Sequence, residues 1–297
     1  MHPQPLVIDA HHHVWDLDVR DQDWITGEEL APIRRTFTLD DLAPEARTAG
    51  VGATVLVQTV TVAEETPEFL ALAHGSDLVA GVVGWTDLTA PDVAGTLAAL
   101  RSLPGGDRLV GIRHQVQGET DPEWLLRPDV LRGLRAVAAA GLVYDLIVRP
   151  HQLPAATRAA ELLPGLTFVL DHAGKPPVAL GTTRPWADGL RALAALPNTV
   201  CKLSGLVTEA DPRSWTVEAL RPYADTVIEA FGAGRLMFGS DWPVCRLAAG
   251  YAEVLDVARE LTGRLGEDEQ RSVFAGTAQR VYGLRPPSLR PGCAPQA

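Results

Sequence analysis

Residues 6–15 read LVIDAHHHVW, a short apolar run that leads directly into three histidines. A nearly continuous apolar run of about four to eight residues is typical of a strand that is covered on both faces, as in a parallel sheet. In an open doubly wound sheet, a glycine-rich phosphate-binding turn would follow the first strand. Histidines stand in that place here, so this segment favours a closed barrel over the open sheet.

Seven further apolar runs follow the first, and helical segments rich in Ala, Leu and Arg separate them. The predicted strands are 6–11, 53–59, 79–85, 109–115, 142–148, 167–172, 199–204 and 236–241. The predicted helices are 39–49, 65–75, 91–102, 129–140, 153–163, 186–196, 217–231, 250–265 and 268–282. Strands that alternate with helices in this way predict a single α/β domain, a (β/α)8 TIM barrel over residues 1–284.

Two segments fall outside the alternation of strands and helices. Residues 14–38 are long for a connection between a strand and a helix, and loops of this length in compact domains are usually functional or disordered. We expect this loop to cover the pocket. Residues 285–297 read RPPSLRPGCAPQA and are expected to form a proline-rich C-terminal tail.

Composition narrows the class of protein. Of the 297 residues 46% are hydrophobic, and 37 acidic against 26 basic residues give a net charge of −11. Such a chain lacks the clustered positive charge that a nucleic-acid surface needs. No apolar stretch approaches a membrane span, the N-terminus shows no secretory signal, and three cysteines without close spacing argue against disulfides. We expect a soluble cytoplasmic protein that acts on a small molecule, as a monomer or a homo-oligomer.

Polar residues gather at the predicted carboxyl ends of the strands, where the active site of a barrel of this type lies. His11 and His13 are two apart on the first strand, so both imidazoles face one side while His12 faces the other. Two imidazoles on one wall can hold zinc, although an isolated pair is also compatible with ordinary hydrogen-bonded histidines. His172 and Asp241 close later strands and would complete a cluster of three imidazoles and one carboxylate.

Arg113 ends the apolar run LVGIR, where a guanidinium must find an anion or a carbonyl oxygen. It either pairs with an internal carboxylate such as Asp145 or faces a substrate. Lys202, inside the run TVCKLSG, has the same alternatives.

Longer motifs resemble the amidohydrolase superfamily, of the amidohydrolase 2 type. They are IDAHHHVW (8–15), LDHAGKP (170–176), CKLSGLVTEAD (201–211), LMFGSDWPV (236–244) and FAGTAQRVYGL (274–284). Three more resemble the branch of that superfamily that contains sugar lactonases: VVGWTDL (82–88), GIRHQVQ (111–117) and LVYDLIV (142–148). The resemblance extends from about residue 6 to residue 284.

The resemblance implies a distorted barrel that hydrolyses a sugar-acid lactone to the aldonate. In the family, the strand-one histidines, the strand-six histidine and the strand-eight aspartate line the site, and these match His11, His13, His172 and Asp241. The family's strand-four arginine matches Arg113. The bridging lysine or glutamate and the strand-five histidine of binuclear members have no counterpart here, so the resemblance implies one zinc ion or none.

These residues support a mechanism for ester hydrolysis. Asp241 is the predicted general base that activates a water, and His172 and Arg113 are predicted to polarise the carbonyl and stabilise the oxyanion. A single optional zinc ion held by His11, His13 and Asp241 would take over part of that polarisation. The predicted substrate-binding residues are Gln58, Trp85, Asp87, His114, Gln115, Asp145, Lys202 and Trp242.

Several alternatives stay open at this point. Zinc-dependent decarboxylases of the same superfamily share the histidine pair, the late histidine and the final aspartate, but they need a firmly bound metal. A barrel that binds sugar acids without turnover is a further alternative. The tryptophans can equally be core residues, and Lys175 can serve the substrate or fix the loop after the sixth strand.

Overall fold

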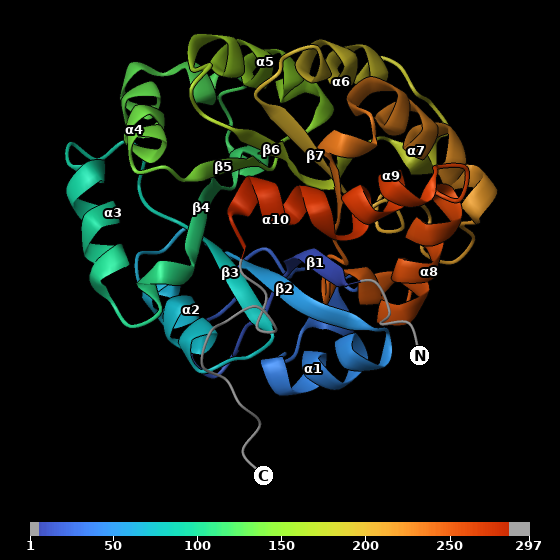
Figure 1. Cartoon of the computed structure of the whole chain (residues 1–297), viewed down its shortest axis with the longest axis horizontal. Helices are drawn as coiled ribbons and strands as arrows, with labels where there is room; N and C mark the ends of the chain where they lie inside the picture. Colours follow the sequence, from blue (N-terminus) through green and yellow to red (C-terminus); the bar gives the residue numbers. More distant parts are fainter. Residues whose placement is uncertain (1–5, 285–297) are drawn as a thin grey trace.

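The computed structural model describes residues 6–284, and the predicted tail 285–297 lies outside this range. Eight parallel strands pair in sequence order around a ring, which Figure 1 shows in end view. The strands are β1 (Val7–His12), β2 (Val51–Val57), β3 (Val79–Gly84), β4 (Leu109–His114), β5 (Val143–Leu146), β6 (Phe168–Leu170), β7 (Thr199–Leu203) and β8 (Leu236–Phe238). The predicted single-domain (β/α)8 barrel is confirmed.

Helices follow the strands and cover the outside of the ring, except for the last helix, which lies across one end of it (Figure 1). They are α1 (Leu39–Thr48), α2 (Glu65–His74), α3 (Val93–Ser102), α4 (Pro128–Ala139), α5 (Leu153–Leu162), α6 (Trp186–Ala194), α7 (Val217–Phe231), α8 (Tyr251–Leu261), α9 (Glu267–Arg271) and α10 (Thr277–Tyr282). The segment predicted as one helix over 268–282 is divided by a π-helical turn, Ser272–Gly276, which buries Val273 and Phe274. Among the described helices, none has the length and apolar character needed to cross a membrane.

Backbone hydrogen bonds join β1 to the segment after β8 and so complete the ring. The amide of Asp241 donates to the carbonyl of His11 at 2.8 Å, and the amide of His13 donates to the carbonyl of Trp242 at 2.7 Å. Both bonds lie at the carboxyl ends of the strands. Closure of the barrel therefore brings the predicted strand-one and strand-eight site residues side by side.

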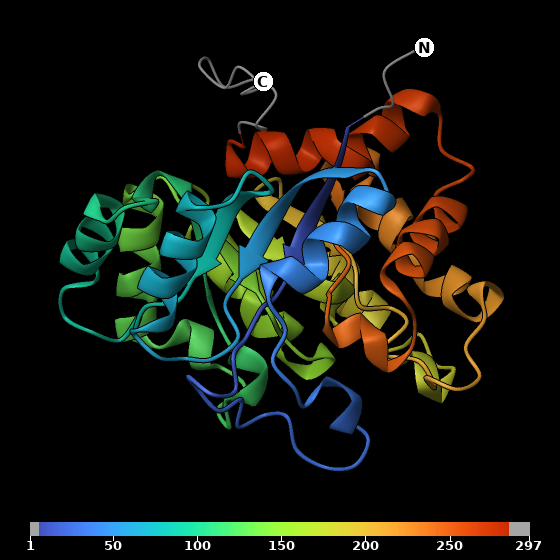
Figure 2. The same ribbon diagram turned by 90° about the horizontal axis from the view of Figure 1, so that it is seen from below.

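The long loop 14–38 extends from the carboxyl end of the barrel, opposite α10, as Figure 2 shows in dark blue. Trp15 and Phe37 exchange backbone hydrogen bonds of 2.9 Å at its base. Arg20 donates to both carboxylate oxygens of Glu68 on α2, at 2.8 and 2.9 Å. With α1 and α2 the loop lines a cavity of about 880 Å³. The loop thus covers the cavity between α1 and α2. That it also covers the substrate pocket at the carboxyl ends of the strands stays a prediction.

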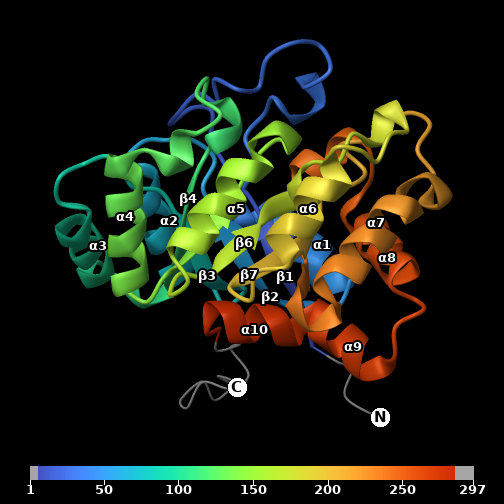
Figure 3. The same ribbon diagram turned by 90° about the horizontal axis from the view of Figure 1, so that it is seen from above.

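The lower half of the barrel interior is apolar and is closed from below by α10, which lies across that end in Figure 3. Ile8, Val55, Val83 and Val169 are buried there with Tyr282 of α10. The upper half is charged. The hydroxyl of Tyr282 reaches from the lower end to the carboxylate of Asp145 in this upper half. The change from apolar to charged interior marks the level at which the site begins.

Four buried charged residues fill this upper level, three from β4, β5 and β7 and one from the turn directly after β6. Lys202 Nζ lies 2.5 Å from Asp145 Oδ2 and 2.9 Å from Asp171 Oδ1. Arg113 Nη1 lies 2.9 Å from Asp171 Oδ2. Their side chains are at most 2% exposed, so two cations and two carboxylates neutralise each other without water. Burial alone would raise the pKa of Asp171. The neighbouring cations Lys202 and Arg113 act against burial, and the pKa stays well below its usual value.

We expect Tyr282→Phe to lower the free energy of unfolding by about 2 kcal/mol, because a hydrogen bond to a buried charged group is lost. The Tyr282 hydroxyl donates to Asp145, 2.9 and 3.0 Å from its two oxygens. Tyr223→Phe is the matched control, since that hydroxyl donates to the neutral carbonyls of Pro177 and Thr182 at 3.4 and 3.1 Å. Urea unfolding of both variants measures the difference, and equal losses would contradict a special contribution from the charge on Asp145.

Candidate active site

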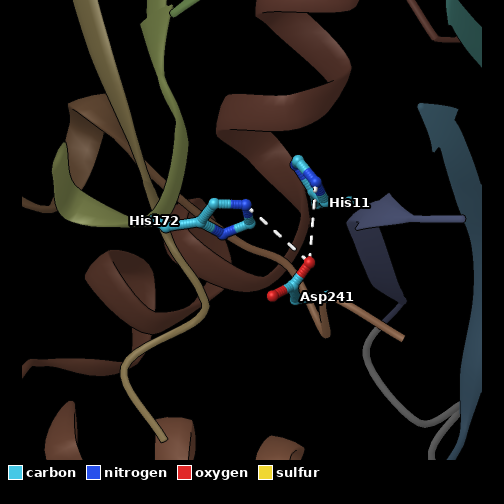
Figure 4. A group of neighbouring side chains, drawn as sticks. All are labelled: His11, His172 and Asp241. Carbon is cyan, nitrogen blue, oxygen red and sulfur yellow. Dashed lines mark ion pairs between the residues drawn. The ribbon is translucent and has the colours of Figure 1, made fainter. Parts of the chain in front are cut away.

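Four predicted residues meet at the carboxyl end of the barrel. His11 and His13 come from the end of β1, His172 from the turn after β6, and Asp241 from the turn after β8. Figure 4 shows His11 and His172 directed toward the carboxylate of Asp241. The Nε2 atoms of His11, His13 and His172 lie 3.8, 3.6 and 3.7 Å from Asp241 Oδ1. The three rings therefore converge on one carboxylate oxygen.

His12 faces the other way, as the alternation of the strand predicts. Its Nε2 lies 2.9 Å from the hydroxyl of Thr54 on β2. Burial lowers the pKa of His12 to about 3, so this ring is neutral and structural. The site thus uses two of the three consecutive histidines.

Each converging imidazole is held through its Nδ1 atom. His13 Nδ1 lies 2.7 Å from the carbonyl oxygen of Val57, and His172 Nδ1 lies 2.9 Å from the hydroxyl of Ser204. His11 Nδ1 lies 3.0 Å from Lys202 Nζ and 3.3 Å from Asp171 Oδ1. Imidazoles that bind metals are commonly oriented through their second nitrogen in this manner. All three Nε2 atoms face the centre, where those of His11 and His13 lie 3.1 Å apart.

Burial keeps the imidazoles neutral while the carboxyl group stays ionised. Desolvation lowers the pKa of His172 to about 4, and it also lowers the pKa of His11 and His13. Burial alone would raise the pKa of Asp241, but electrostatic interaction with His172 and contact with His13 outweigh this effect and leave the pKa below its usual value. At neutral pH the centre is one carboxylate facing three neutral imidazoles.

This set of donors fits a zinc ion. Ligand atoms of His11, His172 and Asp241 all lie within 4.8 Å of one another. Neutral imidazole nitrogens and a carboxylate oxygen are ligands that zinc accepts. The predicted metal set was His11, His13 and Asp241, and the structure places His172 as close to Asp241 as either of these.

The backbone that carries these side chains is strained. Asp241 has φ of 59°, and His172, Ala173, Gly174 and Lys175 form an unbroken left-handed run with φ of 52°, 52°, 70° and 54°. A left-handed conformation costs a non-glycine residue about 1–2 kcal/mol. Such conformations persist where the surrounding structure enforces them, and they concentrate at functional sites.

Two glycines make room for the imidazoles. A Cβ atom on Gly239, after β8, would lie 2.7 Å from the Cβ of His11. A Cβ atom on Gly205, after β7, would lie 2.8 Å from Nδ1 of His172, and Gly205 also has a positive φ of 66°. The close approach of neighbouring strands to both rings therefore requires glycine.

Arg113 is buried as part of the wall beside the cluster. Its Nε donates to the side chain of Gln58 at 2.9 Å, and Nη2 donates to the carbonyl of Gln58 at 2.5 Å. The carboxylate that pairs with it is Asp171, not Asp145, which Lys202 occupies. Of its nitrogens, Nη1 approaches the centre, 3.4 Å from His11 Nε2. Whether Arg113 contacts substrate stays a prediction.

Trp85 and His114 are partly buried neighbours among the predicted substrate-binding residues. Trp85 Nε1 donates to His114 Nδ1 at 3.0 Å, and the His114 ring stacks on Trp124 with centroids 4.2 Å apart. His114 Nε2 lies 2.7 Å from Glu119. Gln115 donates to the carbonyl of Thr59.

The other predicted substrate-binding residues have protein partners. Asp145 and Lys202 are fully buried in the charged level of the barrel. Trp242 is fully buried as well, with its ring edge-on to Phe37 at 5.3 Å, as the alternative of a core tryptophan describes. Asp87 is exposed and accepts hydrogen bonds from the amide and hydroxyl of Thr89.

Glu65 supports the wall of the site and was missed in the sequence, where an acidic residue at the start of a helix is ordinary. It begins α2 and accepts hydrogen bonds from the amide and hydroxyl of Thr59 and from the amide of Val60. These residues follow Gln58 directly. Burial raises the pKa of Glu65 to about 7, although the hydrogen bonds partly offset the effect.

The raised pKa of Glu65 predicts that the stability of the fold depends on pH. Between its ordinary pKa of 4.5 and about 7, the folded chain keeps a proton that the unfolded chain has released, so stability falls as pH rises through this interval. Across this interval the free energy of unfolding falls by at most roughly 3 kcal/mol. We expect Glu65→Gln to lose less stability than the parent between pH 5 and pH 8 in urea unfolding. Parallel curves for the two proteins would contradict the raised pKa.

Comparison with known proteins places the chain in a family. L-fucono-1,5-lactonase from Burkholderia multivorans is 40% identical and covers 95% of this chain and 98% of its own length. The L-fucono-1,5-lactonase from Burkholderia ambifaria is 39% identical, with coverage of 95% and 97%. The crystal structure of an amidohydrolase from Burkholderia multivorans with bound zinc is 40% identical, with a TM-score of 0.89, over 94% of this chain and all of that one. The family model described as Amidohydrolase matches residues 8–284. The chain belongs to the amidohydrolase family.

Proposed function

We propose that the protein is a lactonase that hydrolyses the ring ester of a sugar-acid lactone, with L-fucono-1,5-lactone as the first candidate substrate. The observation that carries the proposal is the convergence of three neutral imidazoles on the carboxylate of Asp241. It gains support from about 40% identity, over nearly the whole chain, to two proteins named L-fucono-1,5-lactonase.

Asp241 is the general base in the proposed mechanism. Its carboxylate is ionised at neutral pH and accepts a proton from the attacking water, while the imidazoles of His11, His13 and His172 surround the reacting carbonyl. The positive charge of Arg113, next to His11, stabilises the oxyanion as it forms. Protonated Asp241 then returns the proton to the ring oxygen as the ester bond breaks.

A zinc ion would be held by His11, His172 and Asp241, with His13 beside them. When bound, it polarises the lactone carbonyl and lowers the pKa of water. A crystallised relative from Burkholderia multivorans holds zinc, which supports this assignment. The orientation of the imidazoles and the ionisation of Asp241 come from the chain itself.

Substrate contacts are assigned to the partly exposed polar residues beside the cluster. Trp85, His114 and Gln115 offer an apolar ring face and hydrogen-bonding groups, as the hydroxyls of a sugar lactone require. The buried residues Asp145 and Lys202 act through the side chains that they hold in place.

The two alternatives have less support. Decarboxylase structures resemble this chain at 16% and 13% identity, a level at which the likeness concerns the fold alone. A barrel that binds sugar acids without turnover leaves the ionised Asp241, buried among imidazoles, without a role.

Proton release with a pH indicator tests the proposal on a panel of L-fucono-, L-rhamnono-, D-arabinono- and L-galactono-lactones. We expect rapid turnover of L-fucono-1,5-lactone and slower turnover of lactones that differ at the ring substituents. A parallel series after chelation decides whether turnover needs a bound metal. No turnover of any lactone, with zinc added or removed, would overturn the lactonase proposal.

Asp241→Asn should lower kcat by at least about 10³-fold, because the amide cannot accept the proton from water. The fold should persist, since the backbone bond from residue 241 to His11 is kept. Asp256→Asn is the control, a surface carboxylate paired with Arg259 on α8, and it should leave kcat unchanged. Near-native turnover of Asp241→Asn would remove Asp241 from the role of base.

A further inference from the structure

The left-handed run 172–175 is anchored at its end by an ion pair. Lys175 Nζ donates to Glu209 Oε1 at 2.6 Å, while the amide of Lys175 donates back to the carbonyl of His172 at 2.8 Å. In the middle of the run, Trp186 Nε1 donates to the carbonyl of Ala173 at 2.7 Å. The turn that carries His172 is thus held from two sides against its conformational preference.

Glu209 belongs to the segment that also touches the imidazole of His172. That segment follows β7 and begins with Ser204, which bonds Nδ1, and Gly205, which packs against the ring. The amide of Glu209 donates to the carbonyl of Gly205 at 3.2 Å. The ion pair therefore joins the turn after β6 to the same segment that sets the ring orientation.

The pair is shielded from water to a degree that surface pairs are not. The side chains of Lys175 and Glu209 are 24% and 23% exposed, whereas those of the Arg47–Asp77 pair are 61% and 79% exposed. Screening by solvent leaves exposed pairs with little effect, so partial burial is what gives an ion pair the strength to constrain a turn. Lys175 also acts electrostatically on Asp241, which indicates that the pair lies near the reacting centre.

We propose that Lys175 and Glu209 are positioning residues whose ion pair holds the left-handed turn and thereby keeps His172 Nε2 directed at Asp241. The part of this proposal that concerns turnover rests on the proposed lactonase function. A displacement of about 1 Å at a catalytic group can lower the rate by up to about 10²-fold, so loss of the pair acts on the chemical step.

Kinetics of Lys175→Met, Glu209→Gln and the double variant test the pair. We expect each single variant to lower kcat about 10-fold with KM within about twofold, and the double variant to be no worse than either single. Lys175→Arg keeps the charge and should retain most of kcat. Arg47→Met breaks the exposed control pair and should leave kcat and KM unchanged.

A second readout does not depend on turnover. In protein labelled with ¹⁵N-histidine, the imidazole signals of His172 are assigned with His172→Gln. We expect them to shift in Lys175→Met and Glu209→Gln, while Lys175→Arg and Arg47→Met keep the parent spectrum. If the parent hydrolyses no lactone, the proposed function fails, yet these spectra still decide whether the ion pair orients His172.

Three results would overturn the positioning role. An increase in KM at constant kcat would make Lys175 a substrate contact. The pair would be merely structural if the melting temperature fell in parallel with kcat while the His172 signals of the folded fraction stayed unchanged. Unchanged kcat and unchanged His172 signals in both single variants would leave the turn independent of the pair.

Discussion

The electrostatic balance inside the barrel is the constraint on which the site depends. Lys202 and Arg113 enter the ring from β7 and β4, and between them Asp145 enters from β5 and Asp171 from the turn directly after β6. Each ion is fully or almost fully buried, so removal of one partner would leave an uncompensated charge away from water. Hydrophobic side chains could fill the same volume, but they could not hold the Nδ1 side of His11.

The proposed catalytic centre is built outward from this balance in successive layers of contact. Asp171 and Lys202 face His11, and backbone or hydroxyl groups of neighbouring strands hold His13 and His172. The shared principle is that one ring nitrogen is fixed by the scaffold and the other is presented to the centre. Precision here comes from rigid strand ends, which place catalytic groups better than free loops do.

Regular periodicity explains why so much of the fold could be predicted. Alternating apolar runs and helical segments identify the eight strands, and the period of two within β1 separates His12 from His11 and His13. Pairing inside the barrel could not be predicted in the same way. Arg113 lies opposite Asp145 in the register of β4 and β5, yet its partner is Asp171 because Lys202 takes Asp145.

Features without a sequence pattern were also beyond prediction. Burial of Trp242 depends on how the turn after β8 packs on Phe37, and the π-helical turn between α9 and α10 keeps the apolar spacing of an ordinary helix. Glu65 looks like any acidic residue at the start of a helix. For Trp242 the deciding contact comes from a segment distant in the chain, whereas Glu65 bonds to the loop just before its own helix, which no residue pattern marks.

Ring closure between β1 and the segment after β8 has a consequence for synthesis on the ribosome. His11 and His13 are synthesised before β2 to β8, whereas Asp241 and the backbone that bonds to β1 are synthesised after them. Domains generally fold as units, and a nascent chain that stops before β8 has imidazoles without their carboxylate and lacks the backbone bonds that close the ring. Such a fragment lacks the proposed general base, so under the proposed mechanism hydrolysis begins only after β8 and the turn that follows it have been made.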